Sequence, residues 1–194
     1  MIDPSAPAYV AFRGERLLAM GDLRSVVAAI KLLIDRGEDG VLVFDPASQQ
    51  VDFDLRGTLA EVLTRLPVDA PPMTENDAPR TRGRPKLGVV AREVTLLPRH
   101  WEWLGRQRGG ASVALRRLVD AARHASADSD RVRAAQEAAH RFMTVMAGDR
   151  PHYEDAARAL FAGDSAKFAR CTQAWPADIR DHARRLAQPA WPPG

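Results

Sequence analysis

Arginine and lysine side chains alternate with small or rigid residues in the middle of the chain. Arg82 and Arg84 lie on either side of Gly83, and Pro85 follows directly. Glycine removes the side chain that would meet a groove wall, and proline keeps the backbone extended, so the two arginines can reach down successive steps of a groove. A narrow A·T-rich minor groove of DNA attracts arginines because its negative potential is enhanced. This spacing therefore predicts a contact with the DNA minor groove.

The four residues from Arg82 to Pro85, with Arg80 and Lys86 as flanking cations, resemble an AT-hook. The resemblance implies double-stranded DNA as the partner, with a preference for A·T-rich sequence. Because the motif is only four residues long, the alternative is a solvated basic linker that binds nothing.

The distribution of charge favours the nucleic-acid interpretation. Residues 1–79 carry a net charge of −6, residues 80–124 carry +8 and residues 125–194 carry +1, although the whole chain carries only +3. A concentrated basic centre is the electrostatic footprint of a protein that binds a polyanion. We expect the acidic front of the chain to face away from DNA, or to shield the basic segment when DNA is absent.

One strand and two helices are expected directly after the basic segment. Residues 89–97 are apolar enough for a strand, and Pro98 suits the first turn of a helix. Gly109 and Gly110 are expected to end that helix, and Ser112 to cap the next one. Glu93–Pro98 with the two helices resembles a ribbon-helix-helix module of the Arc/MetJ type. The resemblance implies a homodimer that pairs through residues 89–97 and places the paired strands in the DNA major groove.

Further contacts with DNA follow from that resemblance. Thr95 is the best candidate for a base contact, and amide groups near Ser112 would hold a backbone phosphate. Together with Arg80 and Lys86, three other arginines would neutralise phosphates: Arg99, Arg116 and Arg117. The alternative is a strand packed on a monomeric helical domain, with Arg116 and Arg117 solvated. Trp101 and Trp103 could stack on bases, but the helical spacing favours core packing for Trp101.

The chain as a whole is expected to be an α+β protein. Asp22 is a good N-cap for an amphipathic helix, and Thr58 with Glu61 forms a capping-box pattern. The predicted organisation is a small β-β-α-β-β-α domain (1–66), a proline-rich linker (67–79), the AT-hook-like segment (80–88), a ribbon-helix-helix-like centre (89–125), a helical region (126–187) and a loose tail (188–194). We expect the helices of 126–187 to wrap the central module.

The run from Arg82 to Leu104, RGRPKLGVVAREVTLLPRHWEWL, is similar to one shared by a family of uncharacterised bacterial proteins. The similarity extends over nearly the full length and implies no particular activity.

Catalytic patterns find little support in the sequence. No phosphate loop, nucleophile elbow, dinucleotide fingerprint or Cys-x-x-Cys pair is present, and His140, His152 and His182 have no metal-ligand spacing. We expect no enzymatic activity, no cofactor and no metal. The single Cys171 and the absence of a long apolar run predict a cytoplasmic protein without a membrane segment. The alternative function is a protein-interaction or adaptor module whose basic segment is only a linker.

Overall fold

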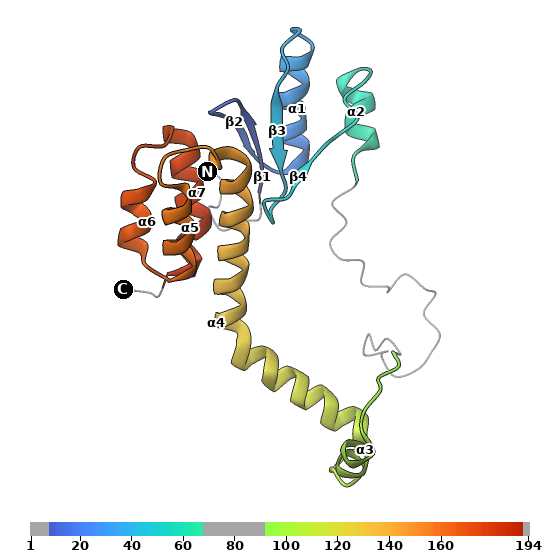
Figure 1. The fold of residues 1–194 in the computed structure, drawn as a ribbon. Coiled ribbons are helices and arrows are strands. Elements are labelled where there is room, and N and C mark those ends of the chain that lie inside the picture. Colours follow the sequence, from blue (N-terminus) through green and yellow to red (C-terminus); the bar gives the residue numbers. More distant parts are fainter. Residues whose placement is uncertain (1–7, 68–91, 192–194) are drawn as a thin grey trace. The chain divides into compact units, whose positions relative to one another are not determined.

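A computed structural model describes residues 8–67 and 92–191 (Figure 1). The AT-hook-like segment 80–88 lies outside the described residues, and with it Arg80, Arg82, Gly83, Arg84, Pro85 and Lys86. The chain divides into two compact units, one made of residues 1–66 and 127–194 and the other of residues 67–126. The expected mixed α+β class is confirmed, because a four-stranded antiparallel sheet occurs together with seven α-helices in the described residues.

The first unit begins with two strands, β1 (Tyr9–Arg13) and β2 (Arg16–Gly21), which form a hairpin. Helix α1 (Leu23–Ile34) follows, and then the strands β3 (Val41–Phe44) and β4 (Gln50–Val51). All neighbouring strands are antiparallel, in the order β2-β1-β3-β4. Apolar and polar residues alternate along residues 51–55, which is the pattern of a half-buried strand. Strand β4 ends at Val51, however, so Val51 is the one residue of this run that joins the sheet.

Local capping signals set the helix starts in this unit. The carboxylate of Asp22 accepts a hydrogen bond from Ser25 N at 2.9 Å and begins α1. Helix α2 (Leu59–Arg65) begins with the expected capping box, in which Glu61 Oε2 accepts from Thr58 N at 2.8 Å. Each cap satisfies an amide that would otherwise lack a partner at the helix end, and both sequence predictions are confirmed.

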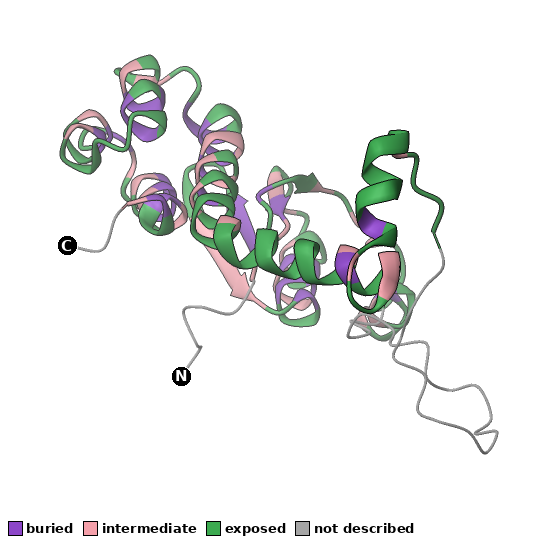
Figure 2. Ribbon diagram, turned by 90° about the horizontal axis from the view of Figure 1, so that it is seen from below, coloured by how far each residue is buried: buried purple, intermediate pink, exposed green. Residues whose placement is uncertain are grey.

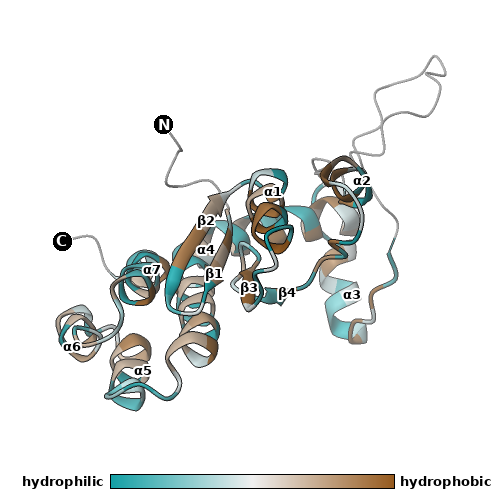
Figure 3. Ribbon diagram, turned by 90° about the horizontal axis from the view of Figure 1, so that it is seen from above, coloured by the Kyte–Doolittle hydropathy of each residue, from teal (hydrophilic) through white to brown (hydrophobic). Residues whose placement is uncertain are grey.

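Both faces of the sheet are buried. Ala11 and Val43 face α1, where they pack against Val26 and Ile30. The opposite face presents Val10, Phe12 and Phe44 to helices from the end of the chain. Figure 3 shows the hydrophobic character of these strands and of α1. Burial on both sides explains why β3, Val-Leu-Val-Phe, is continuously apolar and does not alternate with polar residues.

Helices from the C-terminal half cover the second face. They are the end of α4 (Gly110–Ala147), α5 (Tyr153–Phe161), α6 (Ser165–Cys171) and α7 (Ala177–Ala187), followed by a 3₁₀ turn at Gln188–Ala190. Residues 126–187 were expected to wrap the central module; in the structure Ala139, Phe142 and Met143 instead belong to the same core as Phe12 and Phe44 of the sheet. The Phe142 ring lies 5.2 Å from that of Phe44 and 5.3 Å from that of Phe12, and such aromatic contacts need a large apolar partner surface.

Polar contacts also join the sheet to these helices. Asp178 Oδ2 of α7 accepts from Leu17 N of β2 at 2.9 Å. Arg141 Nε of α4 donates to Ala47 O in the β3–β4 turn at 3.0 Å. The hydrogen bonds fix the register of the helices on the sheet in addition to the apolar core.

The described part of the second unit consists of α3 (Pro98–Gly105) and the beginning of α4. Helix α4 continues without a break from Gly110 to Ala147, across the boundary expected near residue 125. No glycine or proline lies between residues 111 and 147, so no local signal ends the helix there.

Candidate nucleic-acid interface

The described residues of the predicted DNA site all belong to the second unit. Thr95, Arg99, Ser112, Arg116 and Arg117 are exposed, and Figure 2 shows that most of α3 and of the first turns of α4 is exposed with them. Only Leu104 and Ala114 are buried among residues 92–126. The described part of this unit is therefore almost entirely solvent-exposed and has almost no hydrophobic core of its own.

Two consecutive glycines shape the turn between α3 and α4. Gly109 and Gly110 have φ angles of +90° and +76°, which favour glycine over residues with a Cβ. A Cβ at Gly109 would also lie 3.1 Å from Val113 Cγ1, inside ordinary contact distance. The glycine pair thus allows α4 to start directly after the turn that follows α3.

Ser112 does not cap α4. The helix begins at Gly110, whose N–H donates to Gln107 O at 3.0 Å, so Ser112 lies within the first turn. Its carbonyl accepts from Arg116 Nε at 3.2 Å. The prediction of a serine cap was wrong because the glycine pair, which was expected to end α3, starts α4 instead.

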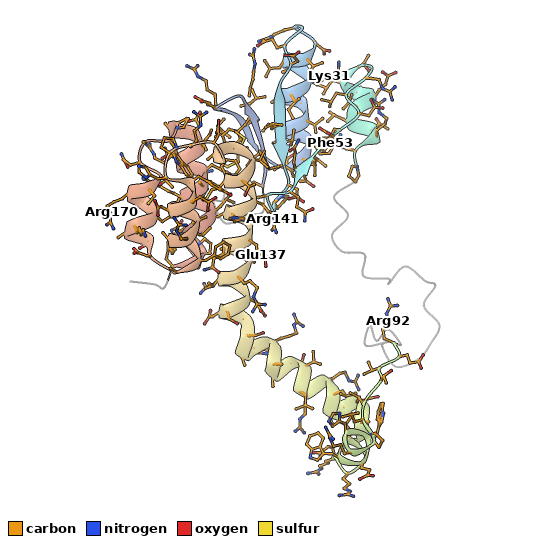
Figure 4. The ribbon with its side chains drawn as sticks, in the orientation of Figure 1. Lys31, Phe53, Arg92, Glu137, Arg141 and Arg170 are labelled. Atoms are coloured by element: carbon orange, nitrogen blue, oxygen red, sulfur yellow. The ribbon has the colours of Figure 1, made fainter. Side chains whose placement is uncertain are left out.

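Ion pairs do not neutralise the positive charge in the described part of this unit. Residues 92–126 contain seven arginines and three carboxylates, a net charge of +4. None of these arginines forms an ion pair with a described residue, whereas Arg131 and Arg133, farther along α4, pair with Asp128 and Asp130. Arg92 is labelled in Figure 4 at the start of this part of the chain. Unpaired guanidinium groups are available for phosphate oxygens.

Two indole side chains accompany these arginines. Trp101 is 44% exposed and Trp103 is 51% exposed. Core packing of Trp101, which the helical spacing favoured, is therefore wrong: the described part of the unit buries too few apolar residues to enclose an indole. The helix that carries Arg99 thus also presents two exposed indoles, which can provide stacking surfaces in addition to charge.

The predicted strand 89–97 is described only from Arg92 onward, and Arg92–Leu97 form neither strand nor helix. Thr95 is exposed there, and Val94 is 53% exposed. A lone strand cannot satisfy its own edge, so a ribbon from these residues requires a second chain.

The three histidines weighed as metal ligands take different places in the first unit. His182 is buried between the rings of Phe12 and Phe142, whereas His140 lies against Phe161. His152 precedes α5 with a positive φ of 63°. Within residues 8–67 and 92–191, no group of three or more potential ligands is placed to hold a metal. Burial, with a smaller effect of Arg185, lowers the pKa of His182 to about 4.

One concave surface of the first unit was not predicted. A depression with a volume of about 380 Å³ is lined by Ser48, His140, Arg141 and Thr144, among others. The Glu137 carboxylate Oε2 lies 3.6 Å from the Arg141 guanidinium Nη1 (Figure 4). Ser48 is buried with a φ of +58°, and hydrogen bonds to the Asp45 side chain fix its turn. Asp-Pro-Ala-Ser is a composition typical of turns, and the tertiary structure places α4 beside this turn through the hydrogen bond from Arg141 to Ala47 O.

No helix among the described residues is long and apolar enough to span a membrane. No curated protein and no solved structure matches the chain. A family model described as "Uncharacterized protein conserved in bacteria" (DUF2239) matches residues 8–187, which covers nearly all of the described residues. The expected relation to an uncharacterised bacterial family is thereby confirmed, and the chain belongs to this family.

Proposed function

We propose that this protein binds double-stranded DNA through its second unit and acts as a transcription regulator or nucleoid-associated factor. The observation that carries the proposal is the surface of α3 and the first turns of α4, where unpaired arginines lie with two exposed indoles. Arg99, Arg116 and Arg117 would contact phosphates, and Thr95, which is exposed in the segment before α3, would contact a base.

The sequence next to this surface supports an A·T preference. Arg82 and Arg84 would enter the minor groove, while Arg80 and Lys86 neutralise the adjacent phosphates. If each chain neutralises five phosphates, the logarithm of affinity falls with the logarithm of salt concentration at a slope of about −4 to −5 per protomer.

A homodimer would complete the DNA-binding surface. No backbone hydrogen bond joins Arg92–Leu96 to another described residue outside their own segment, so their amide and carbonyl groups are available to a second chain. Pairing of residues 89–97 between two chains would bring two sets of arginines onto one DNA duplex.

Fluorescence anisotropy with labelled A·T-rich and mixed-sequence duplexes tests the binding. Arg116→Ala with Arg117→Ala should weaken binding to both duplexes. Arg131→Ala with Arg133→Ala is the matched control, because it removes the same charge from arginines of the same helix that already pair with carboxylates. Equal losses in the two double variants would show that only overall charge matters. Binding that is undetectable at low salt, or unchanged at about 200 mM salt, would refute the proposal.

The A·T preference and the dimer have separate tests. Arg82→Ala with Arg84→Ala should weaken binding to the A·T-rich duplex more than to the mixed duplex. Equal weakening would refute the minor-groove contact but not DNA binding in general. Val94→Pro removes an amide donor from the proposed ribbon and should shift a dimer to monomers in analytical ultracentrifugation. A dimer that persists in Val94→Pro would exclude pairing through residues 89–97.

A further inference from the structure

A groove on the first unit lies where the short strand β4 ends. It has a volume of about 290 Å³ and is bordered by α1, by the beginning of β3 and by the segment that follows β4. Ile30 and Val43 are buried at its floor, and Phe53, labelled in Figure 4, contributes from the segment after β4. Apolar side chains therefore form the base of a recess at the edge of the sheet.

The sheet edge beside this groove is incompletely paired. β4 pairs only with Val43 and Phe44 of β3, through Val51 and Gln50. On that side Val41 and Leu42 have no strand partner among the described residues, although both pair with β1 on their other side. Val41 and Leu42 are only partly buried, and an edge without a partner strand can accept an extended peptide as an additional strand.

Carboxylates border the groove at the same place. Glu38 pairs with Arg13, but neither Asp39 nor Asp52 forms an ion pair with a described residue. An apolar floor with two uncompensated negative charges at its rim complements a side chain that has an aliphatic stem and a cationic head. Arginine and lysine have this construction.

We propose that this groove binds an extended basic segment of a partner protein, which pairs with the edge of β3 at Val41 and Leu42. An arginine or lysine stem lies on the floor formed by Ile30 and Phe53, and its head meets Asp39 or Asp52. Main-chain hydrogen bonds provide affinity in this mode of recognition, and the pocket selects the side chain. The inference is independent of DNA binding, because it concerns acidic residues of the first unit.

Fluorescence anisotropy of a labelled peptide Arg-Val-Arg-Val-Arg-Val, added to the full chain, tests the charge. Asp39→Asn with Asp52→Asn should weaken binding about threefold, as expected for the loss of one partly solvated ion pair at whichever carboxylate the head meets. Asp149→Asn with Glu154→Gln removes the same charge elsewhere on the first unit and should leave the affinity unchanged. Equal weakening in both double variants would overturn the proposal, because the peptide would then sense net charge alone.

The apolar floor has its own matched pair of variants on α1. Ile34 lines the groove and is 39% exposed, whereas Leu32 is 56% exposed and does not line it. Ile34→Asn should weaken peptide binding, and Leu32→Asn should not. In the unmodified chain, the peptide should shift the amide resonances of Val41 and Leu42, which locates the contact without any variant. Absence of those shifts, or absence of binding, would overturn the proposal. If Ile34→Asn then also abolished self-association of the protein, the occupant of the groove would be a second copy of this chain.

Discussion

The buried imidazole of His182 should make the first unit sensitive to mild acid. Its ring lies 4.6 Å from that of Phe142 and 5.7 Å from that of Phe12, and its Nδ1 has no hydrogen-bond partner among the residues that the structure describes. Burial and, to a smaller extent, Arg185 lower its pKa from 6.5 to about 4. Because the unfolded chain binds the proton more readily than the folded chain, stability is lost as the pH falls from about 6.5 towards 4.

The magnitude follows from the difference between the two pKa values. One pKa unit corresponds to about 1.4 kcal/mol, so the full loss is on the order of 3 kcal/mol. The linkage between protonation and folding predicts that about 2 kcal/mol of this loss in the free energy of unfolding occurs between pH 7.5 and pH 5. Hydrogen bonds lower the pKa of several carboxyls from ordinary values of 3.8 or 4.5, so their stabilisation is lost mainly below pH 5. The loss of stability between pH 7.5 and pH 5 therefore reports mainly on the imidazole of His182 and little on these carboxyls.

Urea unfolding at pH 7.5 and pH 5 measures this loss. The indole N–H resonance of Trp175 reports on the first unit alone, because the indole is buried and donates to Pro151 O at 3.0 Å. His182→Leu should reduce the pH-dependent loss by about 2 kcal/mol, whatever its stability at pH 7.5. His100→Asn removes an exposed imidazole in the second unit and is the control, which should keep the loss seen in the native chain.

Two results would refute this reasoning. One is a pH dependence in His182→Leu equal to that of the native chain. The other is an NMR titration of the folded protein in which the His182 ring protonates near pH 6.5, since the buried site would then accept the charge without penalty.

Three further changes test the packing and the turns. Phe142→Ala removes a fully buried ring from the core of the first unit and should cost about 3–5 kcal/mol in urea unfolding. Thr58→Ala removes the capping box with Glu61 and should cost about 1 kcal/mol, with faster amide exchange in the first turn of α2. Gly109→Ala places a Cβ at a positive φ against Val113, and should destabilise the start of α4 by about 1–2 kcal/mol, measured by amide exchange in its first turns.

Each of these expectations has an outcome that contradicts it. A cost below about 1 kcal/mol for Phe142→Ala would mean that the helices do not pack on the sheet as described. Unchanged exchange in Thr58→Ala would mean that α2 is stabilised by its contacts with α1 alone. Gly105→Ala, where a Cβ meets no atom within 4 Å, is the control for Gly109→Ala, and equal effects would exclude strain at Gly109.

The sequence predicted the features of this fold that depend on a few neighbouring residues. The cap at Asp22 and the capping box at Thr58 are present, because a cap requires only a side chain and an amide two or three residues away. Ala139 and Phe142, which lie three residues apart on one stripe of α4, are buried, as expected for apolar residues at helical spacing. The separation of acidic and basic segments also follows from the sequence alone.

Periodicity could not identify the partner of each apolar face. The stripe on α4 packs on Phe12 and Phe44, more than ninety positions earlier in the chain, because ring shapes and volumes select the partner surface. The same limit explains Trp101, whose spacing resembles that of a core residue although no apolar surface in the described part of its unit covers it.

The amino-acid sequence by itself therefore determined the caps of α1 and α2, which depend on contacts within about one helical turn, and the basic centre of the chain, which depends on composition alone. Only the tertiary structure decided that the C-terminal helices join the N-terminal sheet in one unit, that the described arginines of the other unit remain unpaired, and that Asp39 and Asp52 border a groove. Those features depend on pairings between residues far apart in the chain, which are selected by shape, burial and charge after the local elements have formed.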